Sequence, residues 1–134
     1  MSRNTIIGII AVVIIFIVGI SIYIIPLIVS GQTSIFMNSV QTTTGNTWVW
    51  SARSGNGSRT RNLNLNLYDL ENVTLTSSSF AGEIYLSLSQ GENEKIINVS
   101  NFEGNIDMSD FVAGRISFKL EFHEVSDFNI NLRW

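Results

Sequence analysis

A stretch of 24 residues without a single charge lies near the start of the chain, from Ile6 to Val29. Eighteen of these residues are Ile, Val, Leu or Phe, which favour insertion into a lipid bilayer. As a helix the stretch would be about 36 Å long, and a hydrocarbon core is about 30 Å thick. In lipid every backbone group needs an internal partner, so a helix forms there despite the many β-branched residues. The sequence therefore predicts one transmembrane helix over residues 6–29.

An alternative interpretation of this stretch is a cleavable secretory signal. The apolar part of a signal usually has about 7–15 residues and ends at a small-residue cleavage site. Here the stretch is much longer, and only Val29-Ser30-Gly31 resembles such a site, so we expect an uncleaved anchor. Arg3 precedes the span and the next charge is Arg53, so the positive-inside rule predicts a cytoplasmic segment over 1–5 and an exported domain at the cell membrane.

The residue counts exclude several classes of chemistry. The chain has no cysteine, which excludes thiolate metal sites and a cysteine nucleophile, and one histidine, which excludes multi-histidine metal sites. His123 lies by parity on the solvent side of its strand, and no motif supplies it with a nucleophile. Acidic residues exceed basic ones by three, with no Lys/Arg run, so nucleic acid is not an expected partner. We expect neither enzyme activity nor a cofactor.

After a polar linker over 30–46, the chain alternates between apolar and polar residues, as half-buried antiparallel strands do. The long alternating segments are Leu63–Leu67, Ile84–Leu88, Ile116–Phe122 and Phe128–Trp134. Shorter candidates are Thr47–Ala52, Val73–Thr76, Lys95–Val99 and Asn105–Met108, and turn residues such as Gly55-Asn56-Gly57 separate them. The pattern predicts an all-β domain over 47–134, an antiparallel β-sandwich or jelly roll of about 7–9 strands, with no helix beyond the anchor.

The segment from Trp48 to Arg61 is unusual because it combines two tryptophans with three arginines. Trp48 and Trp50 share parity, and Arg53, Arg59 and Arg61 follow in a Ser/Gly-rich segment. Two tryptophans on one strand face usually belong to a core. If that face is exposed instead, the five residues form an aromatic and cationic patch suited to a protein partner or to lipid headgroups.

Acidic residues cluster between Glu103 and Asp110. Asp107 and Asp110, with Glu103, offer carboxylates to a calcium ion, although the spacing is not that of an EF-hand loop. The alternative is a solvated acidic turn.

Three sequons would permit N-glycosylation of an exported domain, at Asn56, Asn72 and Asn98. In a chain this rich in Asn, Ser and Thr, such triplets also arise by chance.

A short cationic leader, a long apolar helix and a β-domain together resemble archaeal type IV pilins and the stator proteins of the archaellum. The resemblance covers the architecture of the whole chain and carries over no specific residue. Pilins have Gly or Ala after the basic residue at the processing site, whereas Asn4 follows Arg3 here.

The leading hypothesis is a non-catalytic envelope protein whose β-domain binds other envelope proteins or further copies of itself, in a filament, surface layer or stator. The second is an accessory subunit of a respiratory or transport complex in the membrane. The third is a surface module that binds carbohydrate through Trp48 or Trp50. In all three the lipid bilayer is a partner.

Overall fold

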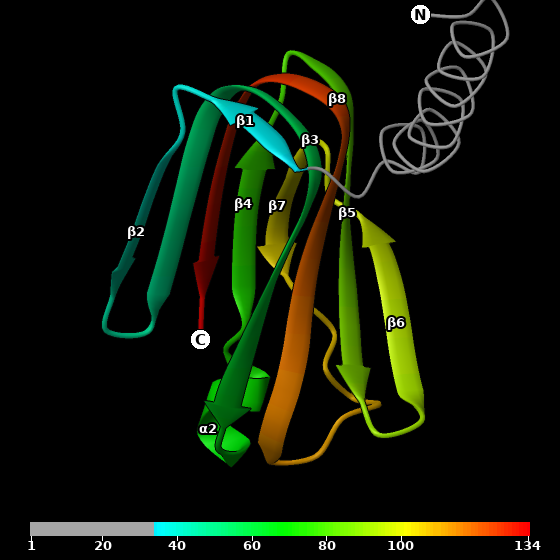
Figure 1. Cartoon of the computed structure of the whole chain (residues 1–134). Coiled ribbons are helices and arrows are strands. Elements are labelled where there is room, and N and C mark those ends of the chain that lie inside the picture. The colour runs from blue at the N-terminus through cyan, green and yellow to red at the C-terminus, as the bar shows by residue number, and fades with distance from the viewer. Residues whose placement is uncertain (1–33) are drawn as a thin grey trace, which may run out of the picture. The chain divides into compact units, whose positions relative to one another are not determined.

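The computed structural model describes residues 34–134, which form an antiparallel β-sheet of eight strands with one short helix (Figure 1). In chain order the elements are β1 (Ile35–Met37), β2 (Val40–Thr44), β3 (Thr47–Leu65), α2 (Leu67–Glu71), β4 (Thr74–Ser78), β5 (Ala81–Gln90), β6 (Asn93–Asn98), β7 (Phe102–Asn105) and β8 (Gly114–Arg133). The predicted all-β antiparallel fold is confirmed, and the number of strands lies within the expected range.

The predicted membrane-spanning helix, residues 6–29, lies outside the described residues. Among residues 34–134, no helix has the length and hydrophobicity needed to cross a membrane.

The fold is organised by two long strands, β3 with 19 residues and β8 with 20, which pair with each other from end to end. Both bend midway. The register between them shifts at Gly55–Gly57, and Glu124 and Asp127 in β8 have left-handed φ angles of 49° and 44°. Irregularities of this kind insert an extra residue and bend a strand. Each long strand therefore continues from one half of the sheet into the other.

The sequence-based division of these long strands is wrong. In β3 the inward residues are even-numbered as far as Ala52 but odd-numbered at Leu63 and Leu65. Such a change of parity suggests two strands with a turn at Gly55-Asn56-Gly57, but these glycines lie in the bend of one continuous strand. The alternation is interrupted between 122 and 128, which suggests two strands, 116–122 and 128–134, but both belong largely to β8.

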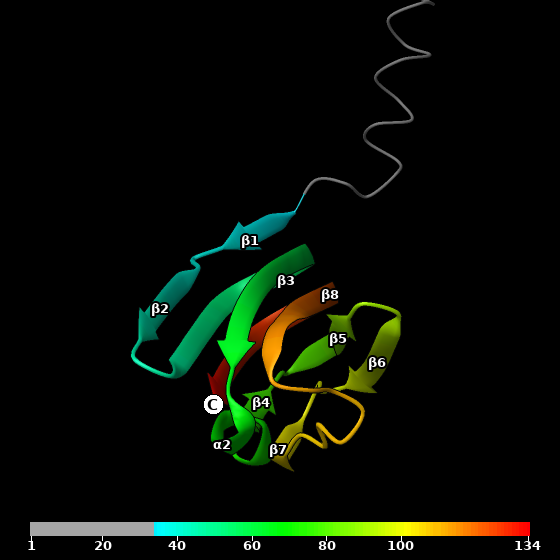
Figure 2. The ribbon, with the colours of Figure 1, turned by 90° about the horizontal axis from the view of Figure 1, so that it is seen from below.

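The two halves of the sheet face each other in a β-sandwich-like arrangement (Figure 2). One half contains β2, the first part of β3, the last part of β8, β4 and β7. The other contains the last part of β3, the first part of β8, β5 and β6. The core between them is built from inward-facing side chains, including Trp50, Leu75, Ile84, Leu86, Phe118, Phe122 and Ile130, each at most 1% exposed.

The predicted linker over 30–46 was too long, because β1 and β2 fall within it. From Ser34 onward the chain belongs to the domain. β2 pairs with β3 at the edge of the sheet, and all five of its residues are exposed. A strand without a buried face shows no apolar alternation, so the pattern that revealed the other strands is missing here.

The short helix α2 was not predicted. A reciprocal capping box starts it: the Asp69 backbone N–H donates to Asn66 Oδ1 at 2.9 Å, and the Asn66 backbone N–H donates to Asp69 Oδ2 at 3.0 Å. Five residues are too few to show a helical repeat, so only the cap residues could have signalled it.

Candidate interaction site

The two tryptophans of the predicted patch belong to the core. Trp48 is 2% exposed and Trp50 is 1% exposed. The Trp50 ring lies 4.6 Å from the rings of both Phe36 and Phe122, measured between centroids, and its Nε1–H donates to Ser39 Oγ at 2.7 Å. The exposed-tryptophan interpretation is therefore wrong. The carbohydrate-binding hypothesis required an exposed indole at Trp48 or Trp50. Because both indoles are buried, we abandon it.

Arg59 and Arg61 face inward at the side of the sandwich where β2 and the last part of β3 form the edges. They pair across the sheet with Leu120 and Phe118, whose side chains are buried. The Arg59 guanidinium lies 5.7 Å from the centre of the Phe36 ring, and that of Arg61 lies 5.5 Å from the Trp48 ring. Arg61 Nη1 also donates to Thr43 Oγ1. The charged groups of these two arginines therefore lie over aromatic rings at the edge of the core.

Arg53 lies apart from the other two arginines. It is exposed and lines a shallow depression with Asn38, Ser51 and Asp127. The five residues of the predicted patch therefore do not form one surface. Two are core residues, two cover the core, and one lies in this separate depression.

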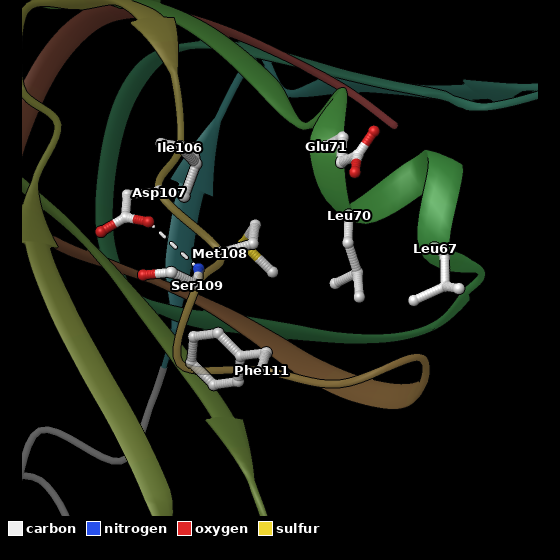
Figure 3. Close-up of a pocket in the computed structure, with 8 residues that line it drawn as sticks. All are labelled: Leu67, Leu70, Glu71, Ile106, Asp107, Met108, Ser109 and Phe111. Carbon is white, nitrogen blue, oxygen red and sulfur yellow. Dashed lines mark hydrogen bonds between the residues drawn. The ribbon is translucent and has the colours of Figure 1, made fainter.

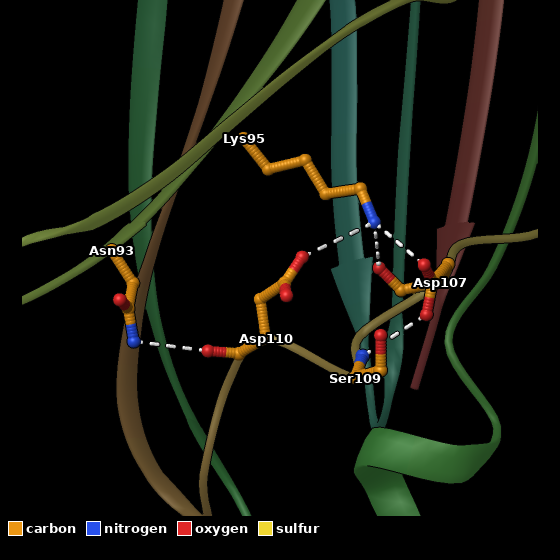
Figure 4. Close-up of polar contacts among 5 residues, drawn as sticks. All are labelled: Asn93, Lys95, Asp107, Ser109 and Asp110. Atoms are coloured by element: carbon orange, nitrogen blue, oxygen red, sulfur yellow. Dashed lines mark hydrogen bonds and ion pairs between the residues drawn. The ribbon is translucent and has the colours of Figure 1, made fainter.

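The acidic cluster is organised around Lys95 (Figure 4). Lys95 Nζ lies 2.8 Å from Asp107 Oδ2 and 3.7 Å from Asp110 Oδ2, and it donates to the Asp107 carbonyl at 2.9 Å. The Ser109 backbone N–H donates to Asp107 Oδ1 at 3.0 Å. Hydrogen bonds from Lys95 and Ser109 hold the pKa of Asp107 well below its ordinary value, and the contact with Asp107 raises the pKa of Lys95.

This arrangement is an ion-pair cluster rather than a calcium loop. An ammonium group lies between the Asp107 and Asp110 carboxylates that were the candidate calcium ligands, and Glu103 lies on β7 opposite Thr76. Within residues 34–134, no three His, Cys, Asp or Glu side chains are grouped closely enough to hold a metal ion. The cluster ties the segment after β7 to β6, and Asn93 adds a hydrogen bond to the Asp110 carbonyl at 3.0 Å.

A mostly apolar hollow of about 430 Å³ lies between α2 and the segment 106–111 (Figure 3). Leu67, Leu70, Ile106, Met108 and Phe111 line it, with Glu71, Asp107 and Ser109. Sequence reasoning missed it because one wall is the unpredicted helix. Its lining contains no histidine or cysteine, and its Asp107 carboxylate is paired with Lys95.

His123 is exposed, as its strand parity predicted. Its ring lies edge-on to that of Tyr85, with centroids 5.7 Å apart. The hydrogen bond with Glu83 is the main cause of a raised pKa at Tyr85.

The three sequon asparagines, Asn56, Asn72 and Asn98, are all exposed. Asn72 Nδ2 donates to the Tyr68 carbonyl at 2.7 Å. Asn98 Oδ1 accepts from both the backbone N–H and the hydroxyl of Ser100.

No protein-family model matches the chain, and no curated protein or solved structure matches it either. The resemblance to archaeal pilins and archaellum stators therefore stays a prediction.

Proposed function

We propose that the protein is a non-catalytic, single-pass membrane protein whose exported β-domain binds other envelope proteins, in a filament, surface layer or stator. One observation carries the proposal. A domain with its own core begins at Ser34, only four residues after an uncharged apolar stretch of 24 residues. A stretch of this length and composition favours a transmembrane helix, which would hold the domain close to the membrane.

The exposed edges of the sheet support binding to other proteins. In the described part of the chain, four strands pair with a single neighbour each: β1, β2, β6 and β7. Exposed edge strands are usually protected by charged residues or proline, because they can pair with another chain. β2 reads Val-Gln-Thr-Thr-Thr, with neither protection. β1 also lacks both but has only three residues, so the five-residue β2 is the edge best suited to accept a strand from a partner or from a second copy.

The membrane anchor is tested by extracting native membranes with alkaline carbonate and identifying the N-terminal peptide by mass spectrometry. The proposal expects the chain to stay with the membranes and to retain residues 6–29. Release into the supernatant, or a mature chain that begins after Val29, would overturn it.

The mass of the N-terminal peptide also distinguishes a filament subunit from an accessory subunit of a larger complex. Loss of only the first few residues, with the apolar stretch intact, would indicate a filament subunit. An intact start at Met1 or Ser2, with co-purification in a larger detergent-solubilised complex, would favour the alternative, an accessory subunit of a respiratory or transport complex.

The edge strand is tested by photo-crosslinking in native membranes. Because the chain has no cysteine, a benzophenone maleimide can be attached to a single introduced residue, Thr42→Cys on β2 or Thr76→Cys on β4. Both threonines are exposed, but β4 has a strand on each side. We expect a defined protein adduct at position 42 and none at 76. Equal crosslinking at both positions would contradict a role for the β2 edge.

A further inference from the structure

Four exposed apolar side chains gather at one end of the domain. Ile35 and Met37 on β1 are 62% and 59% exposed, Val40 at the start of β2 is 63% exposed, and Phe80 before β5 is 86% exposed. Phe80 is the most exposed of the large apolar residues in the described part of the chain. We call these four residues the apolar rim.

The strand register places the two parts of the rim close together. Met37 pairs with Ser54 on β3, Ser54 pairs with Ser126 on β8, and the Phe80 backbone N–H donates to the Ser126 carbonyl at 3.0 Å. Neighbouring strands are about 4.8 Å apart, so this row spans about 15 Å along the sheet. Figure 1 shows that β1 and the chain entering β5 lie where β3 and β8 bend.

The chain itself limits how far the rim can lie from the predicted anchor. Six residue steps separate Val29, the last residue of the anchor, from Ile35. At no more than about 3.6 Å a step, they span at most about 22 Å. The ten residues of β5, which lead to the opposite end of the domain, extend about 30 Å and exceed this reach. The rim therefore lies at the end of the domain where the chain enters from the predicted anchor.

The charges at this end leave apolar contact as the main attraction. Arg53 and Arg59 are exposed near the bends, but so are Glu83, Glu124 and Asp127. Two cations against three anions provide no net attraction to anionic lipids. An interfacial contact lets these charged groups stay in water while the apolar side chains enter the boundary of the bilayer.

From these observations we propose that the apolar rim inserts into the lipid interface and orients the domain on the membrane. The inference rests on the proposed function, because it requires the anchor. It adds a second membrane contact to the helix, and it leaves the opposite end of the domain, with the β5–β6 turn, facing away from the membrane.

The test measures the depth of single fluorescent labels on the full chain, reconstituted in phosphatidylcholine vesicles. An environment-sensitive NBD label is attached at Met37→Cys or Phe80→Cys, with Val112→Cys as the matched control. Val112 is also apolar and 69% exposed, and its backbone is bound by the side chain of Gln90 at the far end of β5. Brominated phosphatidylcholine then quenches any label that reaches the bilayer.

We expect quenching at positions 37 and 80 to be several-fold greater than at 112, without a requirement for anionic lipid. A second variant series carries the label at Val40→Cys. In this series, the double substitution Met37→Ser and Phe80→Ser should reduce quenching of the label at position 40 several-fold. The control substitution Val112→Ser should leave that quenching unchanged. These three positions are exposed, so the substitutions leave the core intact.

Suppose that the chains float with the vesicles but that quenching at positions 37 and 80 is no greater than at 112. This result would overturn the rim contact but would not contradict the anchor. Chains that fail to float would overturn the anchor and the rim contact together. Energy transfer between copies at position 37 without lipid quenching would also overturn the proposal, because a second copy would then cover the rim.

Discussion

Gly82, at the rim end, should be hard to replace, because its backbone conformation and its surroundings both exclude a side chain. Its φ is +85°, in the left-handed region, and a Cβ atom there would lie 2.5 Å from the Glu124 carbonyl oxygen and 2.6 Å from that of His123. A left-handed conformation costs a non-glycine residue about 1–2 kcal/mol. Overpacking against backbone atoms adds about 1–3 kcal/mol. Gly82→Ala should therefore lower the free energy of unfolding by about 2–5 kcal/mol.

Gly91 provides the matched control. Its φ of +59° carries the same type of conformational cost, but nothing lies within 4 Å of its Cβ position. Gly91→Ala should cost only about 1–2 kcal/mol. With a urea m-value of about 1–3 kcal/mol per M, Gly82→Ala should unfold at a midpoint about 1 M lower than Gly91→Ala. The assay is urea unfolding of the full chain in detergent, followed by the fluorescence of the buried tryptophans.

Equal midpoints for the two alanine variants would refute the reasoning. They would mean that the irregularity between Ala81 and Glu83 can open away from β8 at no cost. The position of Phe80 in the rim would then not be fixed by this contact.

The remaining predictions concern the core and the ion-pair cluster. Trp50→Ala should cost about 3–5 kcal/mol in urea unfolding, whereas a change of about 0.5 kcal/mol or less would indicate a surface residue. Arg61→Met should cost about 0.5–1 kcal/mol through its lost contact with Trp48, and Arg53→Met should stay within about 0.5 kcal/mol of the native chain. Lys95→Met should lower the melting temperature at pH 7. A carboxyl group with a lowered pKa stabilises the fold above its ordinary pKa of about 3.9 and loses that effect as the pH falls, so the melting curves of variant and native chain should converge toward pH 2. A constant difference at every pH would contradict the role of Asp107.

The alternating segments were predictable because strand faces differ in their contact with water. Ile116, Phe118, Leu120 and Phe122 alternate with polar residues, and all four are buried as expected. The same rule identified Ile84–Leu88 and the polar side of His123. It failed for β2, whose residues are all exposed, because alternation reports burial rather than hydrogen bonding.

The candidate site was less predictable than the fold, because its residues depend on contacts between distant segments. Strand parity gave Trp48 and Trp50 a common face, but it could not decide whether that face was covered. Phe36, which lies in the predicted linker, packs on Trp50 and helps to cover it. The position of Arg61 over Trp48 required the bend of β3, which nothing in the local pattern distinguishes from a turn.

By itself, the sequence determined an uncharged apolar segment followed by an antiparallel all-β domain without the cysteines and histidines of common metal sites. Those properties follow from composition and short-range periodicity, which act along neighbouring residues. Only the tertiary structure decided that two bent strands run through both halves of the sheet. It also decided that Lys95 lies between two aspartates, and that Phe80 lies next to the strand row that contains Met37. These features depend on strand register and bulges, and register is set by pairing between segments far apart in the chain.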